Sequence, residues 1–492
     1  MKYSSLQIKS ETLDDFLVKI RNSSRNPEIH ANPFFYLVKP TEENLKKYAL
    51  KRPESLLLYL LEISLFLPFI MFHFIATILY SILFSQRSSP GEISNTQNCK
   101  YLFVSHFTYA QTPTREDLFF GKNLSIGNSL SFYLNHTKTP SSLIQKAFQE
   151  SGKEDVQINA KTLKPIQMMT LQFQQLKISC LLLRNSIFSS ELMVSQKRLL
   201  IKAAVFQHSR PTMANLVFIR HFSKVIARVN PRFVILTIEG HAHEALLLQM
   251  RNSIPVDFCI VGYQHSPLVA GQRNFFRIIS LFQPRDVLLT SGQITQQLVK
   301  NKNLVFRVEN LGSPKSREFK SQSKSKSRIQ VLLAPEGTID SLSDFISISN
   351  QLALKLPAIH FVLRTHPALG ERAKKLLKRE LSLIENLTQS TNSLHEDLES
   401  SHIVIFRSSA VGIEGLAWNA LPIHFNHLKG NFLNPLEGSN LEGSSTVNIE
   451  ELLDVIKKYD PNLYQTEAIQ LRNYELFLNY YGPLLDITRL IY

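Results

Sequence analysis

From about residue 98 onward, short apolar runs alternate with longer amphipathic stretches, and this alternation constrains the fold more than any other feature of the sequence. Short apolar runs of this kind predict buried parallel strands, and the stretches between them are long enough for covering helices. The clearest runs are residues 101–105, 233–238, 258–263 and 287–290 in the first half, and 329–333, 360–363, 403–406 and 421–425 in the second. Two such series predict an α/β chain with two Rossmann-like domains facing each other across a cleft.

A polar segment separates the two series. Residues 313–328 read SPKSREFKSQSKSKSR, which is rich in Ser and Lys and has no apolar face. This composition is typical of a linker. We therefore expect a first, acceptor-side domain over residues 98–312, a linker over 313–328, and a second, donor-side domain over 329–492.

A long apolar run precedes the first series. Residues 55–84 contain a single charged residue, Glu62, and exceed the ~20 residues needed to cross a bilayer. Pro68 lies inside the run and can kink or end a helix. We therefore assign residues 1–54 as a polar N-terminal segment and 55–86 as a hydrophobic membrane segment, which is either a kinked span or a re-entrant, surface-lying hairpin. A helix pair buried against the soluble domain remains the alternative.

Basic residues are unevenly placed around this run, because Lys46, Lys47, Lys51 and Arg52 precede it and Arg87 stands almost alone behind it. For a single span, the positive-inside bias would place the N-terminus in the cytosol. The remainder of the chain would then lie on the other side of the membrane, away from nucleotide sugars. The re-entrant or surface-lying arrangement is therefore favoured.

The composition is that of a globular protein with anionic partners. Hydrophobic residues make up 44% of the 492 residues, the net charge is +15 and the pI is about 9.5. Such a charge suits nucleotide phosphates and acidic lipid headgroups. Zinc-finger spacing, RNA-binding aromatic signatures and basic-region helices are missing from the sequence, so a nucleic-acid partner is not expected. The three cysteines, Cys99, Cys180 and Cys259, are too few and too widely spaced for a disulfide framework, which favours a reducing compartment.

Ligands of open α/β sheets bind beyond the carboxyl ends of the strands, so the residues that follow each predicted strand are the candidates for chemistry. Glu336, Gly337 and Thr338 follow the run 329–333. Gly337 permits a tight turn and Thr338 can cap the next helix. Taken alone, this loop is an ordinary turn and cap.

The next strand end carries Arg364, His366 and Pro367. Pro367 suits the first position of a helix, since its missing N–H costs nothing there. His366 would then stand at a helix N-terminus, where anions bind. Arg364 and His366 are able to donate to a phosphate, although a lone His-Pro pair is also a common turn.

The third strand end carries Ser408 and Ser409, followed by Glu414 in the next predicted helix. The two hydroxyls and the following backbone N–H groups could cradle a phosphate, and Glu414 could accept from ribose hydroxyls. A Ser-Ser pair alone is more often a helix cap. Three such loops at successive strand ends together predict a nucleotide-donor site.

The order of these motifs resembles the donor domain of GT-B glycosyltransferases. It is most similar to the bacterial surface-carbohydrate group of capsule and lipopolysaccharide biosynthesis, which includes sialyl-, polysialyl- and Kdo-transferases and the CDP-glycerol-type transferases. The resemblance covers residues 230–425. It implies that His366, Pro367, Ser408 and Ser409 hold the donor's nucleotide and phosphate, with a CMP- or CDP-linked donor favoured.

An acidic-Gly pair ends a strand of the first half at Glu239 and Gly240. In the resembling families such a motif supplies the general base, and a pKa raised by partial burial would suit that role. Glu239 is the first choice and Glu244, about one helical turn further on, the second. Glu239 could also be an ordinary acid at a helix start. His265 also follows a strand and is placed in the cleft, near the acceptor or the donor phosphate.

A bound metal or cofactor is not expected. His241, His243 and Glu244 lack the spacing of a metalloprotease motif, and neither a DxD motif after a strand nor a Walker loop is present. The sequence thus predicts an inverting, metal-independent glycosyltransferase with a nucleotide-sugar donor and a glycan or lipid-linked acceptor, at the cytoplasmic face of the inner membrane. The alternatives are a nucleotide-sugar epimerase, a polyol-phosphate transferase and a non-catalytic membrane-associated binding protein.

Overall fold

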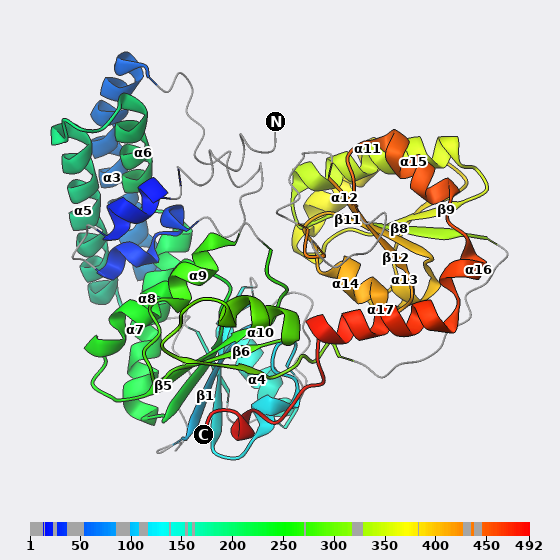
Figure 1. The fold of residues 1–492 in the computed structure, drawn as a ribbon. Coiled ribbons are helices and arrows are strands. Elements are labelled where there is room, and N and C mark those ends of the chain that lie inside the picture. The colour runs from blue at the N-terminus through cyan, green and yellow to red at the C-terminus, as the bar shows by residue number, and fades with distance from the viewer. Residues whose placement is uncertain are drawn as a thin grey trace.

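The structure, a computed structural model, shows two α/β units side by side, with a group of helices standing at one edge of the first unit (Figure 1). It describes residues 13, 15–22, 27–36, 54–84, 99–107, 117–136, 139–152, 156–159, 163–269, 272–316, 328–381, 383–426, 434–436 and 445–492. The long helices of these ranges are α3 (Leu56–Phe84), α4 (Ser141–Glu150), α5 (Pro165–Phe188), α6 (Val194–Phe206), α7 (Arg210–Val229), α8 (Ala242–Met250), α11 (Ile339–Lys355), α12 (Glu371–Glu380), α15 (Ile449–Lys457) and α17 (Glu467–Tyr480). The shorter helices are α9 (Arg273–Ile279), α10 (Gln293–Lys300), α13 (Leu394–Ser400), α14 (Val411–Leu416) and α16 (Pro461–Tyr464).

In the described part of the first unit, seven parallel strands form one sheet in the order β3-β2-β1-β4-β5-β6-β7. The strands are β1 (Tyr101–Phe107), β2 (Ser129–Asn135), β3 (Val156–Ile158), β4 (Phe233–Thr237), β5 (Cys259–Gln264), β6 (Val287–Thr290) and β7 (Arg307–Asn310). The direction of winding reverses between β1 and β4, which is where ligands bind in a doubly wound sheet.

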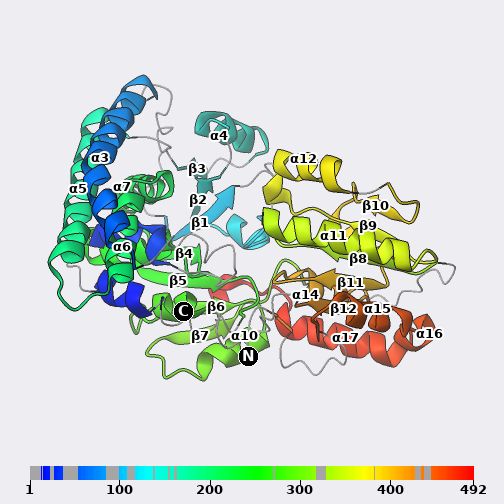
Figure 2. The same ribbon diagram turned by 90° about the horizontal axis from the view of Figure 1, so that it is seen from above.

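The second unit repeats this plan. Its described residues form a six-stranded parallel sheet in the order β10-β9-β8-β11-β12-β13. The strands are β8 (Gln330–Ala334), β9 (His360–Leu363), β10 (Leu387–Gln389), β11 (Ile403–Phe406), β12 (Leu421–Phe425) and β13 (Ser445–Thr446). Here the winding reverses between β8 and β11. Figure 2 shows the helices lying on both faces of each sheet, so both units have the predicted doubly wound architecture.

The predicted strands are all present. Four of them, β6, β9, β11 and β12, have the predicted bounds, and the other four differ by one or two residues at an end. Five strands were missed: β2, β3, β7, β10 and β13. Most of these are short or lie at a sheet edge, where a strand does not need a fully apolar sequence.

The sequence predicted a polar segment over residues 1–54, but the described parts of this range also contribute apolar side chains to the core. Ile29, Phe34 and Phe35 are buried in the core of the first unit. The Asn32 Nδ2 donates to the carbonyl of Ala203 in α6 at 3.0 Å. This segment therefore holds α6 and its neighbours against the first sheet.

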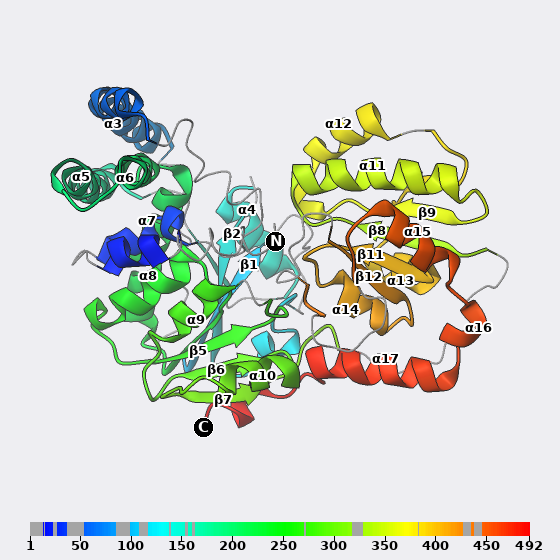
Figure 3. The ribbon, with the colours of Figure 1, turned by 45° about the horizontal axis from the view of Figure 1, so that its top comes forward.

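The apolar run forms one continuous helix, α3, which passes through Pro68 without a break. The predicted helix–break–helix hairpin is therefore wrong. Figure 3 shows α3 as the outermost of three helices, with α5 and α6 between it and the sheet unit. By length and composition alone, Leu56–Leu79 could cross a membrane. The basic residues at positions 46–52 and Arg87 lie outside the described residues, as do residues 317–327 of the predicted linker.

The end of the chain does not stay with the second unit, to which the sequence assigned it. Helix α17 runs along the second unit, and the chain then returns to the first (Figure 1). Ile487 and Ile491 are buried in the core of the first sheet. The hydroxyl of Tyr492 lies 2.8 Å from that of Tyr101 in β1. The second unit is thus tied to the first by the linker and by this returning segment.

Candidate active site

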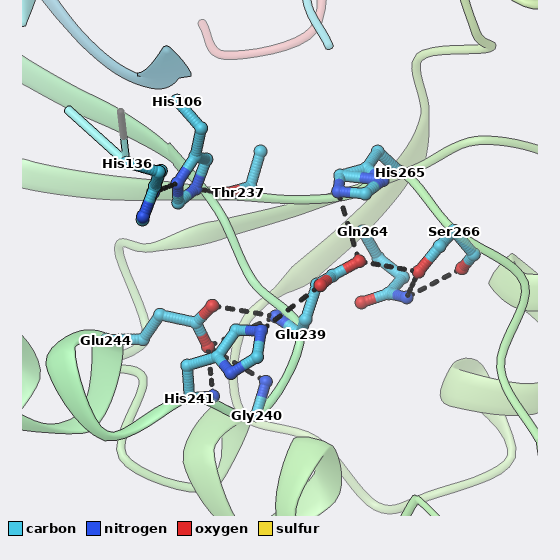
Figure 4. A network of polar contacts seen from close by, with 10 residues as sticks. All are labelled: His106, His136, Thr237, Glu239, Gly240, His241, Glu244, Gln264, His265 and Ser266. Carbon is cyan, nitrogen blue, oxygen red and sulfur yellow. Dashed lines mark hydrogen bonds and ion pairs between the residues drawn. The ribbon is translucent and has the colours of Figure 1, made fainter. Parts of the chain in front are cut away.

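The carboxyl ends of β1, β2 and β4 bring a polar cluster together at the switch point of the first sheet (Figure 4). His106 lies near the end of β1 and His136 directly follows β2. The His106 Nδ1 is 2.8 Å from His136 Nε2, and the His106 Nε2 is 2.9 Å from Thr237 Oγ1. Glu239 stands two residues beyond Thr237, so the predicted acid lies at the edge where a ligand of this fold binds.

The Glu239 carboxylate is held by three side chains. Ser266 Oγ donates to Oε1 at 2.7 Å, His265 Nε2 lies 3.1 Å from Oε1, and His241 Nε2 lies 3.2 Å from Oε2. Burial alone would raise the pKa of Glu239. The hydrogen bond from His241 and the charges of His265 and His241 outweigh it and hold the pKa well below its usual range. This is opposite to the expected direction, so Glu239 is ionised at neutral pH.

Gly240 gives this loop its shape. It has φ +101°, and a Cβ there would lie 2.9 Å from the backbone nitrogen of Phe275. Only glycine combines this left-handed backbone with so close an approach. The acidic-Gly pair of the sequence therefore has a structural reason, because Gly240 turns the chain from β4 toward α8 and leaves Glu239 at the strand end.

Glu244, the second candidate base, is a capping residue. Its carboxylate is fully buried and accepts the backbone N–H groups of Glu239 at 3.0 Å, Gly240 at 2.9 Å and His241 at 2.9 Å. This is the reach-back of a capping box at the start of α8. Burial raises the pKa of Glu244 to about 7, although the N–H donors oppose that rise. Glu244 thus fixes the loop that carries Glu239 and is not among the residues that line the neighbouring cavity.

A cavity of about 530 Å³ lies against Glu239, within the 300–1,000 Å³ range of small-molecule sites. One wall comes from the start of α7, with Pro211, Ala214 and Asn215. The remaining lining is rich in imidazoles and includes Phe119, His106, His136, His241, His243 and His265.

Four of these imidazoles, those of His106, His136, His243 and His265, have lowered pKa values and are largely uncharged at neutral pH. Burial lowers the pKa of His106 to about 3, with the neighbouring His136 and His241 adding to the effect. Burial also lowers the pKa values of His136, His243 and His265. The site therefore places one anionic carboxylate beside these neutral imidazoles, which suits the binding of a hydroxyl-bearing acceptor and the removal of its proton.

The carboxyl edge of the second sheet brings four of the predicted donor residues together. Ser408, after β11, donates its hydroxyl to the carboxylate of Glu336, after β8. A Cβ on Gly337 would lie 2.9 Å from His366 Nδ1, so the His366 ring packs directly on this glycine. The three predicted loops therefore meet at one edge, as the strand-end rule requires.

Other predicted donor residues have different tasks. The Arg364 guanidinium donates to Asp397 at 2.7 Å and to the carbonyl of Asn392 at 2.8 Å, so it is committed within the second unit. Pro367 begins a short 3₁₀ helix, Pro367–Leu369, which agrees with its predicted helix-start position. Ser409 Oγ accepts the backbone N–H of Val411 at 3.4 Å, near the start of α14.

Lys315 links the two units. Its Nζ lies 2.7 Å from Glu414 Oε1 and 5.2 Å from the ring centroid of Tyr481. Burial would lower the pKa of Lys315, but Tyr481 and Glu414 raise it above its ordinary range. The same lysine is close enough to lower the pKa of His265. The predicted ribose contact, Glu414, is therefore paired with a cation whose charge also reaches His265, a partner of Glu239.

Sequence reasoning missed Lys315, His106 and His136. His106 could have been found by reading the residues after 101–105 as the later strand ends were read. His136 follows a strand that the sequence did not reveal, and Lys315 lies in the segment read as a linker. Within the described ranges, His, Cys, Asp and Glu side chains do not form a group of three suited to a metal ion.

Known proteins offer only distant likenesses. No protein-family model and no curated sequence matches the chain. Among solved structures, MnaA of S. aureus with UDP shares 14% identity over 80% of this chain and 95% of that one (TM-score 0.46). A UDP-GlcNAc 2-epimerase of Neisseria meningitidis shares 11% sequence identity over 79% of this chain and 96% of its own (TM-score 0.44). The glycosyltransferase SnogD of Streptomyces nogalater shares 13% identity over 80% of this chain and 99% of its own (TM-score 0.43). The fold assignment accordingly rests on the strand order and the two switch points.

Proposed function

We propose that the chain is a GT-B-type glycosyltransferase that moves a sugar from a nucleotide donor to an acceptor held in the cavity of the first unit. One observation carries the proposal. Each sheet presents a polar cluster at its own switch point, and Lys315 joins the two through its contact with Glu414 and its charge near His265. A donor on one unit and an acceptor on the other would thus meet between Lys315 and Glu239.

The chemistry follows from the charges. Glu239 is ionised and can take the proton of an acceptor hydroxyl as that oxygen attacks the anomeric carbon of the donor sugar. The bond between that carbon and the donor phosphate breaks, and the nucleotide leaves with the electron pair. His366, Ser408 and the Lys315 cation supply the donors and the positive charge that stabilise the departing phosphate. A single displacement of this kind inverts the anomeric configuration.

The proposal also specifies the donor nucleotide, the class of acceptor and the membrane face at which the reaction takes place. A CMP- or CDP-linked donor and a glycan or lipid-linked acceptor of capsule or lipopolysaccharide biosynthesis fit the motif resemblance and the net charge of +15. We place the reaction at the cytoplasmic face of the inner membrane, where such donors and lipid-linked acceptors meet.

The test is calorimetric titration of the purified full chain with CMP, CDP, UDP, GDP and ADP, with His366→Ala alongside. His360→Ala is the matched control, because His360 starts β9 at the opposite, amino end of the strand. We expect one nucleotide to bind, to bind His360→Ala equally well, and to bind His366→Ala at least tenfold more weakly. Absence of nucleotide binding to the folded chain would refute the donor site.

Turnover then separates the reaction classes. The bound nucleotide's sugar donor is incubated with and without a glycan or lipid-linked acceptor, and the products are weighed by mass spectrometry. A sugar added to the acceptor supports the proposal. Conversion of the donor without acceptor would indicate a nucleotide-sugar epimerase. An acceptor whose mass increases by that of a polyol phosphate would indicate a polyol-phosphate transferase. Nucleotide binding without any turnover would indicate a non-catalytic binding protein.

A further inference from the structure

Helix α3 exposes an apolar face along its length. The exposed side chains recur at helical spacing, so they lie on one side of the helix. They include Leu57, Leu61, Leu65, Phe72, Ile75 and Leu79, each between 51% and 76% exposed. Soluble proteins rarely expose so continuous an apolar surface unless it meets a membrane or a partner.

The opposite side of α3 is fixed to the protein. The Tyr59 hydroxyl donates to the carbonyl of Ser186 in α5 at 3.0 Å. Glu62, the only charged residue of the helix, receives Arg198 of α6 in two hydrogen bonds, at 2.7 and 3.0 Å. Further along, the ring of Phe74 lies 5.5 Å from that of Phe173 in α5. Helices α5 and α6 thus run beside α3 (Figure 1).

These companions prevent α3 from crossing a bilayer in this arrangement. If α3 spanned the membrane, α5 and α6 would have to enter the hydrocarbon with it. They carry Lys177, Arg184, Lys197, Arg198 and Lys202, and charged side chains are costly at that depth. A helix that lies in the plane of the membrane avoids this cost, because its protein-facing side stays out of the lipid.

The charge of the companions indicates the kind of membrane. Neither Pro165–Phe188 nor Val194–Phe206 contains an acidic residue, while both contain basic ones. Lysine and arginine beside an apolar face favour a surface of anionic lipid. Apolar insertion and electrostatic attraction therefore favour the same occupant, an anionic leaflet.

We propose that α3 lies flat in one leaflet of an anionic bilayer and docks the protein there through its Leu57–Leu79 face, without spanning the membrane. The docking face is connected to the cavity beside Glu239. The ring of His73 in α3 lies 5.8 Å from that of His208, two residues before α7 begins. Pro211 and Ala214 of α7 then line the cavity. A chain of contacts thus leads from α3 to the acceptor cavity, so the inference rests on the proposed function and deepens it by specifying how a lipid-linked acceptor reaches that cavity.

Flotation of the full chain with vesicles of phosphatidylcholine, with and without phosphatidylglycerol, tests the docking. We expect binding to the anionic vesicles and at least a tenfold loss in the double variant Leu61→Glu/Phe72→Glu. Because both side chains face outward, nucleotide titration should be unchanged in this variant. Leu354→Glu, at an exposed position of α11 in the second unit, is the matched control and should bind vesicles like the wild type.

Depth measurements distinguish lying flat from spanning. Tryptophan is placed singly at Leu57, Leu65 or Leu79, with the only native tryptophan, Trp418, as baseline, and is quenched by brominated lipids. Over the 22 residues between the outer sites a helix rises about 33 Å, roughly the thickness of the hydrocarbon. A flat helix gives equal, shallow quenching at the three sites, whereas deepest quenching at Leu65 would mean a span and overturn the proposal.

Two further outcomes would also overturn it. Failure of the wild type to bind anionic vesicles would do so directly. A dimer that Leu61→Glu/Phe72→Glu dissociates would show that the face joins two copies of the chain. Lipid binding is measured without donor or acceptor. Either result would therefore refute the docking only, and the proposed function would still be tested separately by the nucleotide titration.

Discussion

Replacing Glu239 by glutamine removes the one negative charge of the acceptor site at nearly constant shape. The amide oxygen can still accept from Ser266 at the Oε1 position, but the amide NH₂ then takes the Oε2 position and faces His241 Nε2, which lies 3.2 Å from the wild-type carboxylate. Loss of a positioned base typically lowers turnover 10²- to 10⁴-fold, or about 3–5 kcal/mol of transition-state stabilisation. We expect that loss in kcat for Glu239→Gln.

The folded state should survive this change. The hydrogen bonds to a charged group that Glu239→Gln weakens contribute about 1.5–3 kcal/mol each, against a total stability of roughly 5–15 kcal/mol for a typical domain. Because the donor loops lie on the other unit, nucleotide affinity should stay within threefold of the wild type. Initial rates of donor consumption measure kcat, calorimetry measures nucleotide affinity, and thermal melts measure the stability of the folded state. Turnover above one tenth of the wild-type rate, in a protein that binds nucleotide normally, would refute Glu239 as the base.

The pH profile follows from the same contacts. The partners of Glu239 hold its pKa well below the usual range, so the base stays ionised, and its native contacts intact, until the pH falls through that lowered value. The wild-type kcat/KM should therefore change less than threefold between pH 7 and pH 5. An acid limb with a midpoint near pH 6 would show that a group other than Glu239 accepts the proton.

Three other substitutions probe the supporting structure. Glu244→Gln should destabilise the protein by about 1–3 kcal/mol, because a neutral amide caps the buried N–H groups at the start of α8 less well; denaturant unfolding measures this. Asp286→Ala leaves Arg251, which it holds through two 2.8 Å contacts, buried and unpaired, and should cost about 3–5 kcal/mol in the same assay. Gly337→Ala places a methyl group 2.9 Å from His366 Nδ1 and should weaken nucleotide binding at least threefold in calorimetry with little change in melting temperature.

The sequence predicts the central strands well because their burial on both faces demands unbroken apolar runs. Residues 403–406 and 421–425 are fully buried in β11 and β12, and their bounds match the prediction. In contrast, β7 reads Arg-Val-Glu-Asn at a sheet edge. An edge strand is fixed by pairing to its neighbour, which local composition does not encode.

The apolar run shows a second limit. The propensity of proline predicted a break at Pro68, yet α3 continues through it. Packing of α3 against two long helices outweighs the lost backbone hydrogen bond, and such tertiary stabilisation is invisible in a local pattern. The length and apolarity of the run predict a membrane segment, whereas the way the helix packs on the protein depends on α5 and α6, about a hundred or more residues away in the sequence.

The candidate site divides in the same way. Strand-end reasoning placed Glu239, His366 and Ser408 at the carboxyl edges of the sheets, where the structure has them: Glu239 and Ser408 at the two switch points and His366 after the neighbouring β9. The direction of the Glu239 pKa could not be foreseen, since it depends on His241 folding back onto the carboxylate and on His265 and Ser266 from the next strand end. A residue's place on a sheet edge follows from the chain order, but its charge state follows from neighbours that the fold brings to it.

Lys315 is the clearest case in which the position of a residue follows from the sequence but its contacts do not. Its surroundings in the sequence have the composition of a linker, which predicts a connection between two units and no part in a site. The side chain nevertheless lies 2.7 Å from Glu414 and affects His265 in the other unit. The connection leaves the carboxyl end of β7, and its first residues already reach Glu414 of the second unit, so a cation there can serve the donor phosphate and the acceptor site together. In a chain of this architecture, the first residues of the linker therefore belong to the candidate active site.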